Sequence, residues 1–342
     1  MPNDLKARQD RLTPVSLETV PPPVIERLRD AMVLPVESGR GLANGVFRSG
    51  GSFADLSRTR ISGNRFTDIP TLPEAPPEDR LAGRHLFVGI GRHHFGHFLV
   101  ETAARLWALE GSSVRFDGLL ILPMPHVDFA AVLRQRIRLF FDLMGCDMPI
   151  HLVTKPVLVD ELFLPSQGFG HQQWAVGSAV FRRFMRHRIG LTCPADGPDR
   201  IYISRSKLKQ VFQRVDQEER VERLMAQAGY TVFHPECHDV QVQCQVYRAA
   251  RHIVGGDGSA FHLAPFAVEG GTRVGLIQRR ARVAPVDAIA DQISAFAPVD
   301  LVRLDPLRRG ADGDPPPSVG RTEAQPISFR ALKAQLEEAG LI

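Results

Sequence analysis

Short apolar runs alternate with helical patterns along most of this chain, and that alternation limits the folds open to it. The first half contains three such runs, LFVGI (86–90), GLLILP (118–123) and ELFLP (161–165). Helical patterns lie beside them, at about 95–109, 127–144 and 177–190. Strands that alternate with helices favour a parallel sheet, because a parallel connection needs a crossover segment. The sequence therefore predicts an α/β fold.

The second half repeats the alternation more regularly. Strands are expected at IYIS (201–204), YTVF (230–233), HIVG (252–255) and RVGLI (273–277). Helices are expected between them, at 216–229, 239–250 and 259–268. The D-x-x-E spacing of Asp216 and Glu219 is typical of a capping box at the start of the first helix, and Gly229 would end it. This order predicts a doubly wound unit of the Rossmann kind.

Prolines and glycines divide the chain into segments. Prolines are frequent at 21–24 and 68–79, so residues 1–80 are expected to form an irregular or short-stranded lead-in. The stretch GLTCPADGPD (190–199) is typical of a hinge. We predict two facing Rossmann-like domains, at 81–190 and 191–307, then a flexible segment and a last helix within 308–342.

Composition disfavours several classes of protein. The net charge is only +4 and the basic residues are dispersed, which argues against a nucleic-acid-binding protein. The four cysteines form no C-x-x-C pair, as expected for free thiols in a reducing compartment. The N-terminus lacks the apolar core of a signal peptide, and no run of about 18 apolar residues occurs. We therefore expect a cytoplasmic protein.

Three of the twelve histidines fall within GRHHFGHFLVE (91–101). On a helix, His97, Glu101 and Arg105 would form one polar stripe. The stripe is open to three interpretations: a solvated helix face, a metal site that also uses His93, or a general base. The zinc pattern H-E-x-x-H is absent, which disfavours the metal. A carboxylate beside the imidazole could orient it and raise its proton affinity, as a general base requires.

Basic and hydroxyl side chains follow the strand at 201–204 directly. They are Ser204, Arg205, Lys207 and Lys209. A doubly wound sheet binds its ligands at the carboxyl ends of its strands, and the guanidinium fork pairs naturally with a phosphate. Taken alone, the segment could also be an exposed basic loop.

A glycine-rich turn, HIVGGDGSAFH (252–262), connects a later strand to a helix. Glycines allow close approach of the backbone, and the first N–H groups of the helix can bind an anion. The turn is neither G-x-G-x-x-G nor a P-loop, which disfavours a dehydrogenase, and a purely structural turn is the alternative. The residues expected to contact a ligand here are Gly256, Asp257, Gly258, Ser259 and His262.

Taken together, the three stretches resemble glycosyltransferase family 61, which includes bacterial capsular-polysaccharide biosynthesis proteins. The aromatic-x-HFL-x-[DE] helix of that family, ending in RL, matches FGHFLVETAARL (95–106), and its [YI]-x-SR strand end matches IYISRSK (201–207). The family's G-x-H-G-(A/S) turn falls in the same order, and the likeness covers about 85–280. The resemblance implies a GT-B fold and metal-independent, inverting transfer from a nucleotide-sugar.

Together with the polar stripe, the resemblance predicts roles for individual residues. His97 or Glu101 would remove the proton of the acceptor, while His93, His94 and Arg105 would lie on the acceptor side. The acceptor would be a glycan or a lipid-linked glycan of a surface or capsular polysaccharide. No cofactor, metal or nucleic acid is expected. Peripheral association with membrane-bound polysaccharide machinery, at the inner face of the membrane, is compatible with this role.

The chain departs from the family pattern in the glycine-rich turn. Asp257 stands where the family has histidine, and it would repel a diphosphate by a few kcal/mol unless it is protonated, paired with an arginine or turned away. His262 and Leu263 replace a threonine–asparagine pair. A catalytically inactive nucleotide-sugar or polysaccharide-binding protein of the same fold is therefore one alternative, and a histidine-dependent metal hydrolase is another. The D-x-D at 312–314 lies in a proline-rich tail and is interpreted as accidental.

Overall fold

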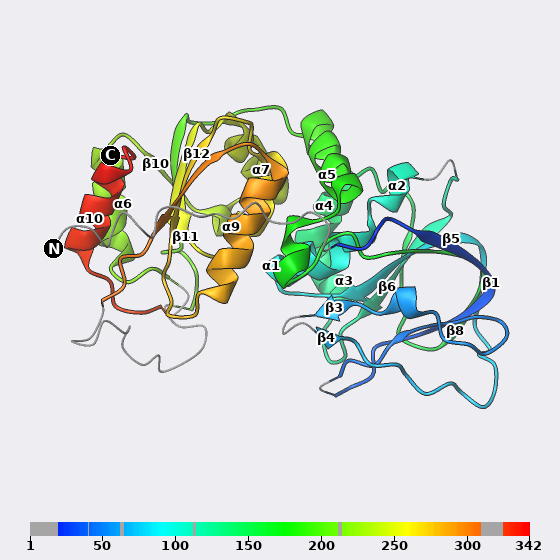
Figure 1. Cartoon of the computed structure of the whole chain (residues 1–342). Helices are drawn as coiled ribbons and strands as arrows, with labels where there is room; N and C mark the ends of the chain where they lie inside the picture. The colour runs from blue at the N-terminus through cyan, green and yellow to red at the C-terminus, as the bar shows by residue number, and fades with distance from the viewer. Residues whose placement is uncertain (1–19, 40, 62–64, 112–113, 211–213, 309–323) are drawn as a thin grey trace.

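The computed structural model describes residues 20–39, 41–61, 65–111, 114–210, 214–308 and 324–342. Within these ranges each half of the chain builds a sheet that packs against helices, and the two halves lie side by side (Figure 1). The prediction of an α/β fold is confirmed. The predicted flexible segment and its D-x-D lie largely or wholly within 309–323, outside the described residues.

The sheet of the N-terminal half has the order β2-β1-β8-β5-β6-β7 among the described strands. These strands are β1 (Ile25–Leu34), β2 (Gly45–Phe47), β5 (Arg80–Gly91), β6 (Gly118–Pro123), β7 (Ile150–Leu152) and β8 (Val157–Pro165). The four strands from β8 to β7 are parallel, whereas β1 is antiparallel to both of its neighbours. The lead-in thus contributes a ten-residue strand, β1, to the sheet. This strand was not predicted, because prolines are frequent on both sides of it in the sequence. A separate antiparallel pair joins β3 (Arg60–Ile61) to β4 (Arg65–Phe66).

The helix predicted at 95–109 is irregular. It consists of α1 (Phe95–His97), a π-helical turn η4 (Phe98–Thr102), a 3-10 turn η5 (Ala103–Arg105) and α2 (Ala108–Gly111). Thr102 ties the π-helical turn to the end of β5, because its hydroxyl donates to the carbonyl of Ile90 and accepts from the amide of Arg92. π-Helical turns often occur at functional sites, where they re-aim side chains.

The helical pattern predicted at about 127–144 corresponds to α3 (Phe129–Val132), η6 (Leu133–Ile137) and α4 (Arg138–Leu143), and the pattern at 177–190 corresponds to α5 (Ala179–Thr192). Two short 3-10 helices, η3 (Asp55–Ser57) and η7 (Gln172–Val176), were not predicted. Asp128 and Ser178 cap α3 and α5, each accepting a bond from a backbone amide in the first turn.

The C-terminal half forms a parallel sheet with the order β10-β9-β11-β12-β13 among the described strands. They are β9 (Arg200–Ile203), β10 (Thr231–Phe233), β11 (His252–Gly256), β12 (Arg273–Ile277) and β13 (Asp300–Leu304). The chain leaves β9 for β10 on one side and returns to β11 on the other. The topological switch point therefore lies between β9 and β11, where open α/β sheets bind their ligands.

Helices cover both faces of this sheet, as the doubly wound prediction requires (Figure 1). Those described are α6 (Glu218–Gln227), η9 (Pro235–Cys237), α7 (Val240–Ala249), α8 (Ala260–Ala267), α9 (Ala284–Phe296) and α10 (Phe329–Glu338). Side chains of β9 alternate between the two cores: Tyr202 packs with α6 and α10, while Ile201 and Ile203 pack with α7 and α8.

The predicted capping box of α6 is wrong, although Gly229 ends the helix region with a φ of +83°. No side chain caps the helix, and Gln217 in a left-handed conformation precedes it. The carboxylate of Asp216 instead accepts from the amide of Ile327, far along the chain. Tertiary contacts with the C-terminal segment thus replace the local cap.

An aromatic cluster joins the two halves. Phe169 and Phe181 of the N-terminal half pack against Phe266 and Phe296 of the C-terminal half, with ring centroids 5.8–6.1 Å apart. The same apolar core continues from one half into the other. We conclude that buried apolar surface holds the two sheets in a defined relative position.

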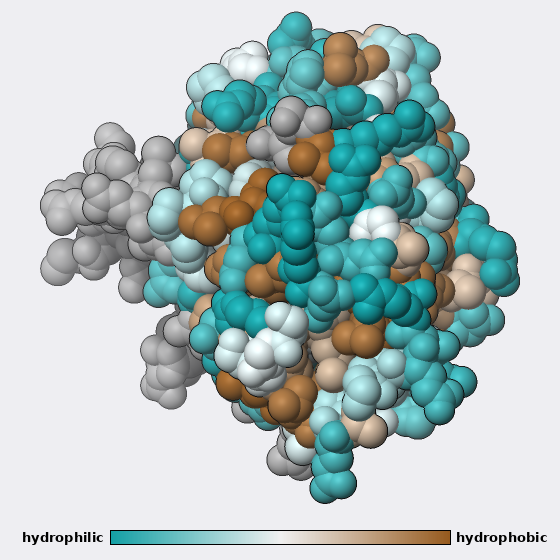
Figure 2. All heavy atoms as spheres, turned by 90° about the vertical axis from the view of Figure 1, so that its right-hand side faces the viewer, coloured by the Kyte–Doolittle hydropathy of each residue, from teal (hydrophilic) through white to brown (hydrophobic). Residues whose placement is uncertain are grey.

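The outer face of the N-terminal half carries apolar side chains in separate patches among hydrophilic ones (Figure 2). Scattered apolar residues are normal on a protein surface. None of the helices in the described ranges combines the length and apolar character needed to span a membrane.

Candidate active site

Glu101 lies at the centre of a buried polar cluster. Its Oε1 accepts hydrogen bonds from Nδ1 of His97 and from Nε2 of His171, both at 2.7 Å. Nε of Arg92 forms an ion pair with Oε2 at 3.0 Å. Three separate segments meet here: the start of the irregular helix, the end of β5 and the loop after β8. His97 and Glu101 thus share a helix face, as their spacing predicts.

Glu101 is ionised, despite a side chain with 0% exposure. Burial alone would raise its pKa, but the hydrogen bonds from His171 and His97, together with the charge of Arg92, lower that pKa to about 2. A carboxylate with so low a pKa is a poor proton acceptor at neutral pH and a good orienting group. With Nδ1 of His97 held by Glu101, Nε2 is the ring nitrogen that can meet a substrate, on a side chain that is 36% exposed.

The same cluster is the candidate metal centre among the described residues. The donor atoms of His97, Glu101 and His171 all lie within 4.8 Å of one another. Both imidazoles, however, already bond to one carboxylate oxygen, and Arg92 places a positive charge beside the other oxygen. That charge would repel a divalent cation.

Arg105 does not belong to this cluster, contrary to the predicted stripe. Its side chain is fully buried and donates to the backbone carbonyls of Pro165, Leu56 and Arg58 at 2.7–3.0 Å. Burial lowers its pKa to about 9. The change from π to 3-10 helix between Glu101 and Arg105 breaks the four-residue repeat. Arg105 therefore links the chain before β5 to the end of β8. Its buried side chain is not accessible to an acceptor substrate.

We expect Arg105→Met to lower the free energy of unfolding by about 3 kcal/mol or more, because several buried carbonyls would lose their donor. Denaturant unfolding would measure this change. Arg223→Met, on the exposed side of α6, is the matched control and should stay within about 0.5 kcal/mol of wild type. Unchanged stability combined with lost turnover would instead restore an acceptor role for Arg105.

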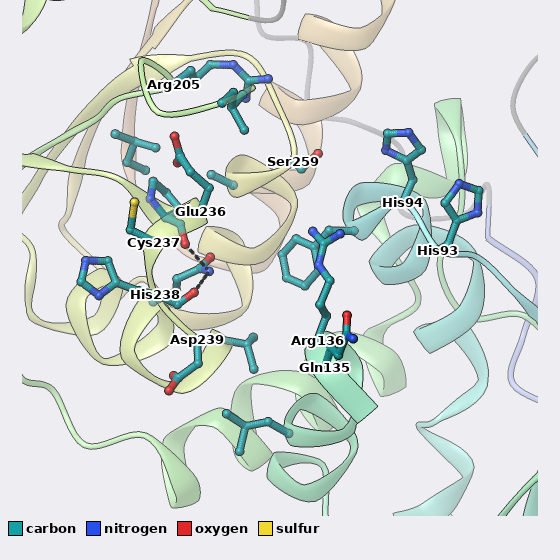
Figure 3. Close-up of a pocket in the computed structure, with 18 of the residues that line it drawn as sticks. His93, His94, Gln135, Arg136, Arg205, Glu236, Cys237, His238, Asp239 and Ser259 are labelled. Atoms are coloured by element: carbon teal, nitrogen blue, oxygen red, sulfur yellow. Dashed lines mark hydrogen bonds between the residues drawn. The ribbon is translucent and has the colours of Figure 1, made fainter. Parts of the chain in front are cut away.

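A cavity of about 610 Å³ opens between the two halves (Figure 3). From the C-terminal half, Ser204, Arg205 and Ser259 line it, and from the N-terminal half His93 and His94 do so, all as the sequence predicts. Burial and neighbouring cations lower the pKa of both histidines. The cavity lies at the carboxyl ends of β9 and β11, which is the switch point.

Arg134 and Arg136 also line this cavity, and the motif analysis missed them. They come from the π-helical turn η6, and Figure 3 shows Arg136 reaching from it into the cavity. Their R-x-R spacing within LRQRIRLF was a signal that could have found them.

The two predicted anion-binding loops touch each other. A Cβ built on Gly258 would lie 2.0 Å from a terminal nitrogen of Arg205, so only glycine allows the guanidinium to lie against this turn. Gly256 is equally confined, since a Cβ there would lie 2.6 Å from Val215. Ser204 donates to Glu222 at 2.6 Å. The loops are thus brought together across the switch point.

Lys207 and Lys209 lie on the same loop as Arg205 but behave differently. Their side chains are exposed and do not line the cavity. For a phosphate contact, either lysine would have to turn its side chain from solvent toward the cavity.

Asp257 is paired with arginines. Its buried Oδ2 accepts from Nε of Arg280 at 2.6 Å, and its Oδ1 accepts from the amide of Arg279 at 3.1 Å. Arg279 and Arg280 follow β12, so the strand-end signal that identified Arg205 could have found them too. Pairing with an arginine is one of the three arrangements that make this substitution compatible with a nearby anion.

His262 lies behind the turn and is held by Gln292. Nδ1 of His262 bonds to Oε1 of Gln292 at 2.8 Å, and burial lowers the pKa of the imidazole to about 4. His262 is therefore neutral and does not line the cavity.

The histidine cluster and the cavity meet at Gly96. A Cβ there would lie 3.0 Å from Oγ of Ser259 and 3.3 Å from His262, so the start of the irregular helix touches the start of α8. His97 and Glu101 are not among the residues that line the cavity, but they lie directly beside this contact. His171, on a loop 70 residues away, was not predicted because nothing local indicates that its side chain reaches Glu101.

The same segments correspond to a known family. The family model Glycosyltransferase 61 matches residues 95–275, which is more than half of the chain. The match begins at the irregular helix and includes His97, Glu101, Arg205 and the glycine-rich turn. A comparison with curated proteins finds no match. By the extent of this match, and with its segments meeting around one cavity, the chain belongs to glycosyltransferase family 61.

Proposed function

We propose that this glycosyltransferase moves a sugar from a nucleotide-sugar donor to a glycan or lipid-linked glycan acceptor, with inversion and without a metal. The two α/β halves on either side of one cavity support a GT-B-like arrangement, with the donor on the C-terminal half. The proposed setting is biosynthesis of a surface or capsular polysaccharide, at the cytoplasmic face of the membrane. The observation that carries this proposal is Arg205 at the switch point.

Positive charge around the cavity supports binding of a diphosphate. The guanidinium groups of Arg205, Arg279 and Arg280 lie near three carboxylates, those of Asp257, Glu218 and Glu236, and Arg134 and Arg136 add two more cations to the cavity lining. Burial lowers the pKa of Arg205, and it lowers that of Arg279 to about 9. A bound anion would stabilise these buried cations, and the N–H groups at the start of α8 near Ser259 would also bind that anion.

The proposed reaction is a single displacement. The acceptor oxygen attacks the anomeric carbon, and its proton passes to Nε2 of His97. The bond from that carbon to the diphosphate oxygen breaks, and its electron pair leaves with the nucleoside diphosphate. Arg205 and the amides at the start of α8 stabilise the growing negative charge. One attack opposite the leaving group inverts the anomeric centre.

Two features support metal independence. Arginines already supply the positive charge that a divalent cation would provide to a diphosphate. In addition, Arg92 neutralises the carboxylate of the candidate metal centre. Metal binding by His97, Glu101 and His171 would also engage the proposed base. The inactive alternative is not favoured, because Asp257 is paired with Arg280.

Binding of nucleotides tests the proposal. Melting temperatures would be measured with a panel of nucleoside diphosphates and nucleotide-sugars, each with and without EDTA. A ligand at about 100 times its Kd should stabilise the protein by about 2.7 kcal/mol, and EDTA should leave the shift and the turnover unchanged. If no nucleotide raises the Tm, the donor assignment is contradicted. If EDTA abolishes turnover and one metal restores it, the reaction needs a metal at the histidine cluster or the diphosphate.

A further inference from the structure

We propose that Glu236 recognises the ribose hydroxyls of the donor and so selects ribonucleotides over deoxyribonucleotides. This inference rests on the proposed use of a nucleotide-sugar. Glu236 lies in η9, directly after β10, and it lines the cavity. Figure 3 shows Glu236 and Arg205 on the same side of the cavity.

Topology is the first argument. β9 and β10 are the first two strands of the doubly wound unit, and they are adjacent and parallel. In such units the phosphates bind after the first strand, and an acidic residue near the end of the second strand hydrogen-bonds the ribose. Arg205 occupies the first of these positions and Glu236 the second.

The order of residues along the sheet edge is the second argument. Strands β10, β9 and β11 are neighbours, and they lead to Glu236, Arg205 and Ser259. Neighbouring strands are about 4.8 Å apart, so the three positions follow one another along the sheet edge. A donor laid along this edge would place its ribose at Glu236, its diphosphate at Arg205 and its sugar at Ser259. The sugar would then lie beside Gly96, where the histidine cluster begins.

The chemistry of the side chain is the third argument. Within the described residues, the carboxylate of Glu236 has no hydrogen bond or ion pair, although its charge acts on nearby Arg205. Asp239, the other acid of the cavity lining, already caps α7 by accepting from the amide of Val242 at 2.9 Å. A carboxylate repels phosphate but accepts hydrogen bonds from a vicinal diol. The carboxylate of Glu236 is therefore suited to accept hydrogen bonds from the ribose hydroxyls.

Paired ribonucleotides and deoxyribonucleotides test this assignment. Dissociation constants of UDP, GDP, ADP and CDP, and of their 2′-deoxy forms, would be measured by calorimetry with the full chain. For a nucleotide that binds, removal of the 2′-hydroxyl should weaken binding to the wild type about ten- to hundredfold. Glu236→Ala should bind the ribonucleotide more weakly by a similar factor and should no longer distinguish the two forms. Glu236→Gln, which keeps one acceptor oxygen, should be intermediate.

Asp239→Asn is the matched control, because it removes a charge from the same lining and keeps the helix cap. It should retain the wild-type preference for the ribonucleotide. If nucleotides bind but the wild type shows no preference, or Glu236→Ala keeps it, the ribose assignment is overturned and the donor proposal stands. If the preference disappears in Asp239→Asn instead, Asp239 holds the ribose. If no nucleotide binds the wild type, the proposed function itself fails.

Discussion

Replacing His97 by alanine is expected to lower turnover by about 10²–10⁴-fold, while donor binding and stability change little. The reason is that proton transfer matters in the transition state, whereas the donor is assigned to the other half of the molecule. Single-turnover kinetics, with nucleotide affinity measured in parallel, would check this result. The partly exposed imidazole leaves little cavity behind when it is truncated.

The pH dependence identifies the base. If His97 is the base, wild-type activity should fall on the acidic side as the imidazole gains a proton, and His97→Ala should lose this acidic limb. Glu101 cannot produce that limb near neutral pH, because its pKa is about 2. Glu101→Gln should lower turnover, because it removes the charged group that orients both imidazoles. A larger loss of turnover than in His97→Ala would indicate that the carboxylate of Glu101 is the base.

His171 is the alternative candidate for the general base, because it bonds to the same carboxylate oxygen of Glu101. His171→Ala should keep an acidic limb if His97 is the base. Loss of the limb in His171→Ala, with near-normal turnover in His97→Ala, would transfer the role to His171. Near-normal turnover in both variants, with unchanged pH dependence, would make the cluster structural.

Replacing Arg205 by alanine is expected to cost roughly 2–4 kcal/mol of transition-state stabilisation, or about 30- to 1,000-fold in kcat/KM. Arg205 lines the cavity and lies against Gly258, so its planar fork is held where the leaving diphosphate is proposed to bind. Arg205→Lys should recover little, since a point charge lacks that fork.

Stability must be measured alongside this effect, because Arg205 is largely buried and favoured in its charged form by Asp257 and Glu218. Arg223→Ala, on the exposed side of α6, is the matched control and should leave turnover near the wild-type value. A folded Arg205→Ala protein with wild-type turnover and nucleotide affinity would disprove the assignment.

Local patterns in the sequence determined the class of fold and two parts of the site. Alternating apolar runs identified β6, β9, β11 and β12 nearly to the residue, because strand and helix periodicity depend on neighbouring side chains. The four-residue spacing placed His97 beside Glu101. Arg205 and Ser259 were found because parallel strands bring their carboxyl ends to one edge.

Tertiary packing alone decided which polar groups are buried and with which partners. It inserted the ten-residue strand β1 antiparallel to β8, where proline signals predicted an irregular or short-stranded lead-in. It brought His171 to Glu101 and buried Arg105 under backbone carbonyls. It also paired Asp257 with Arg280, which removed the repulsion that the turn sequence suggested. Periodicity is a property of a short segment, but the partner of a buried charge comes from segments distant in the chain, because desolvation makes an unpaired charge too costly.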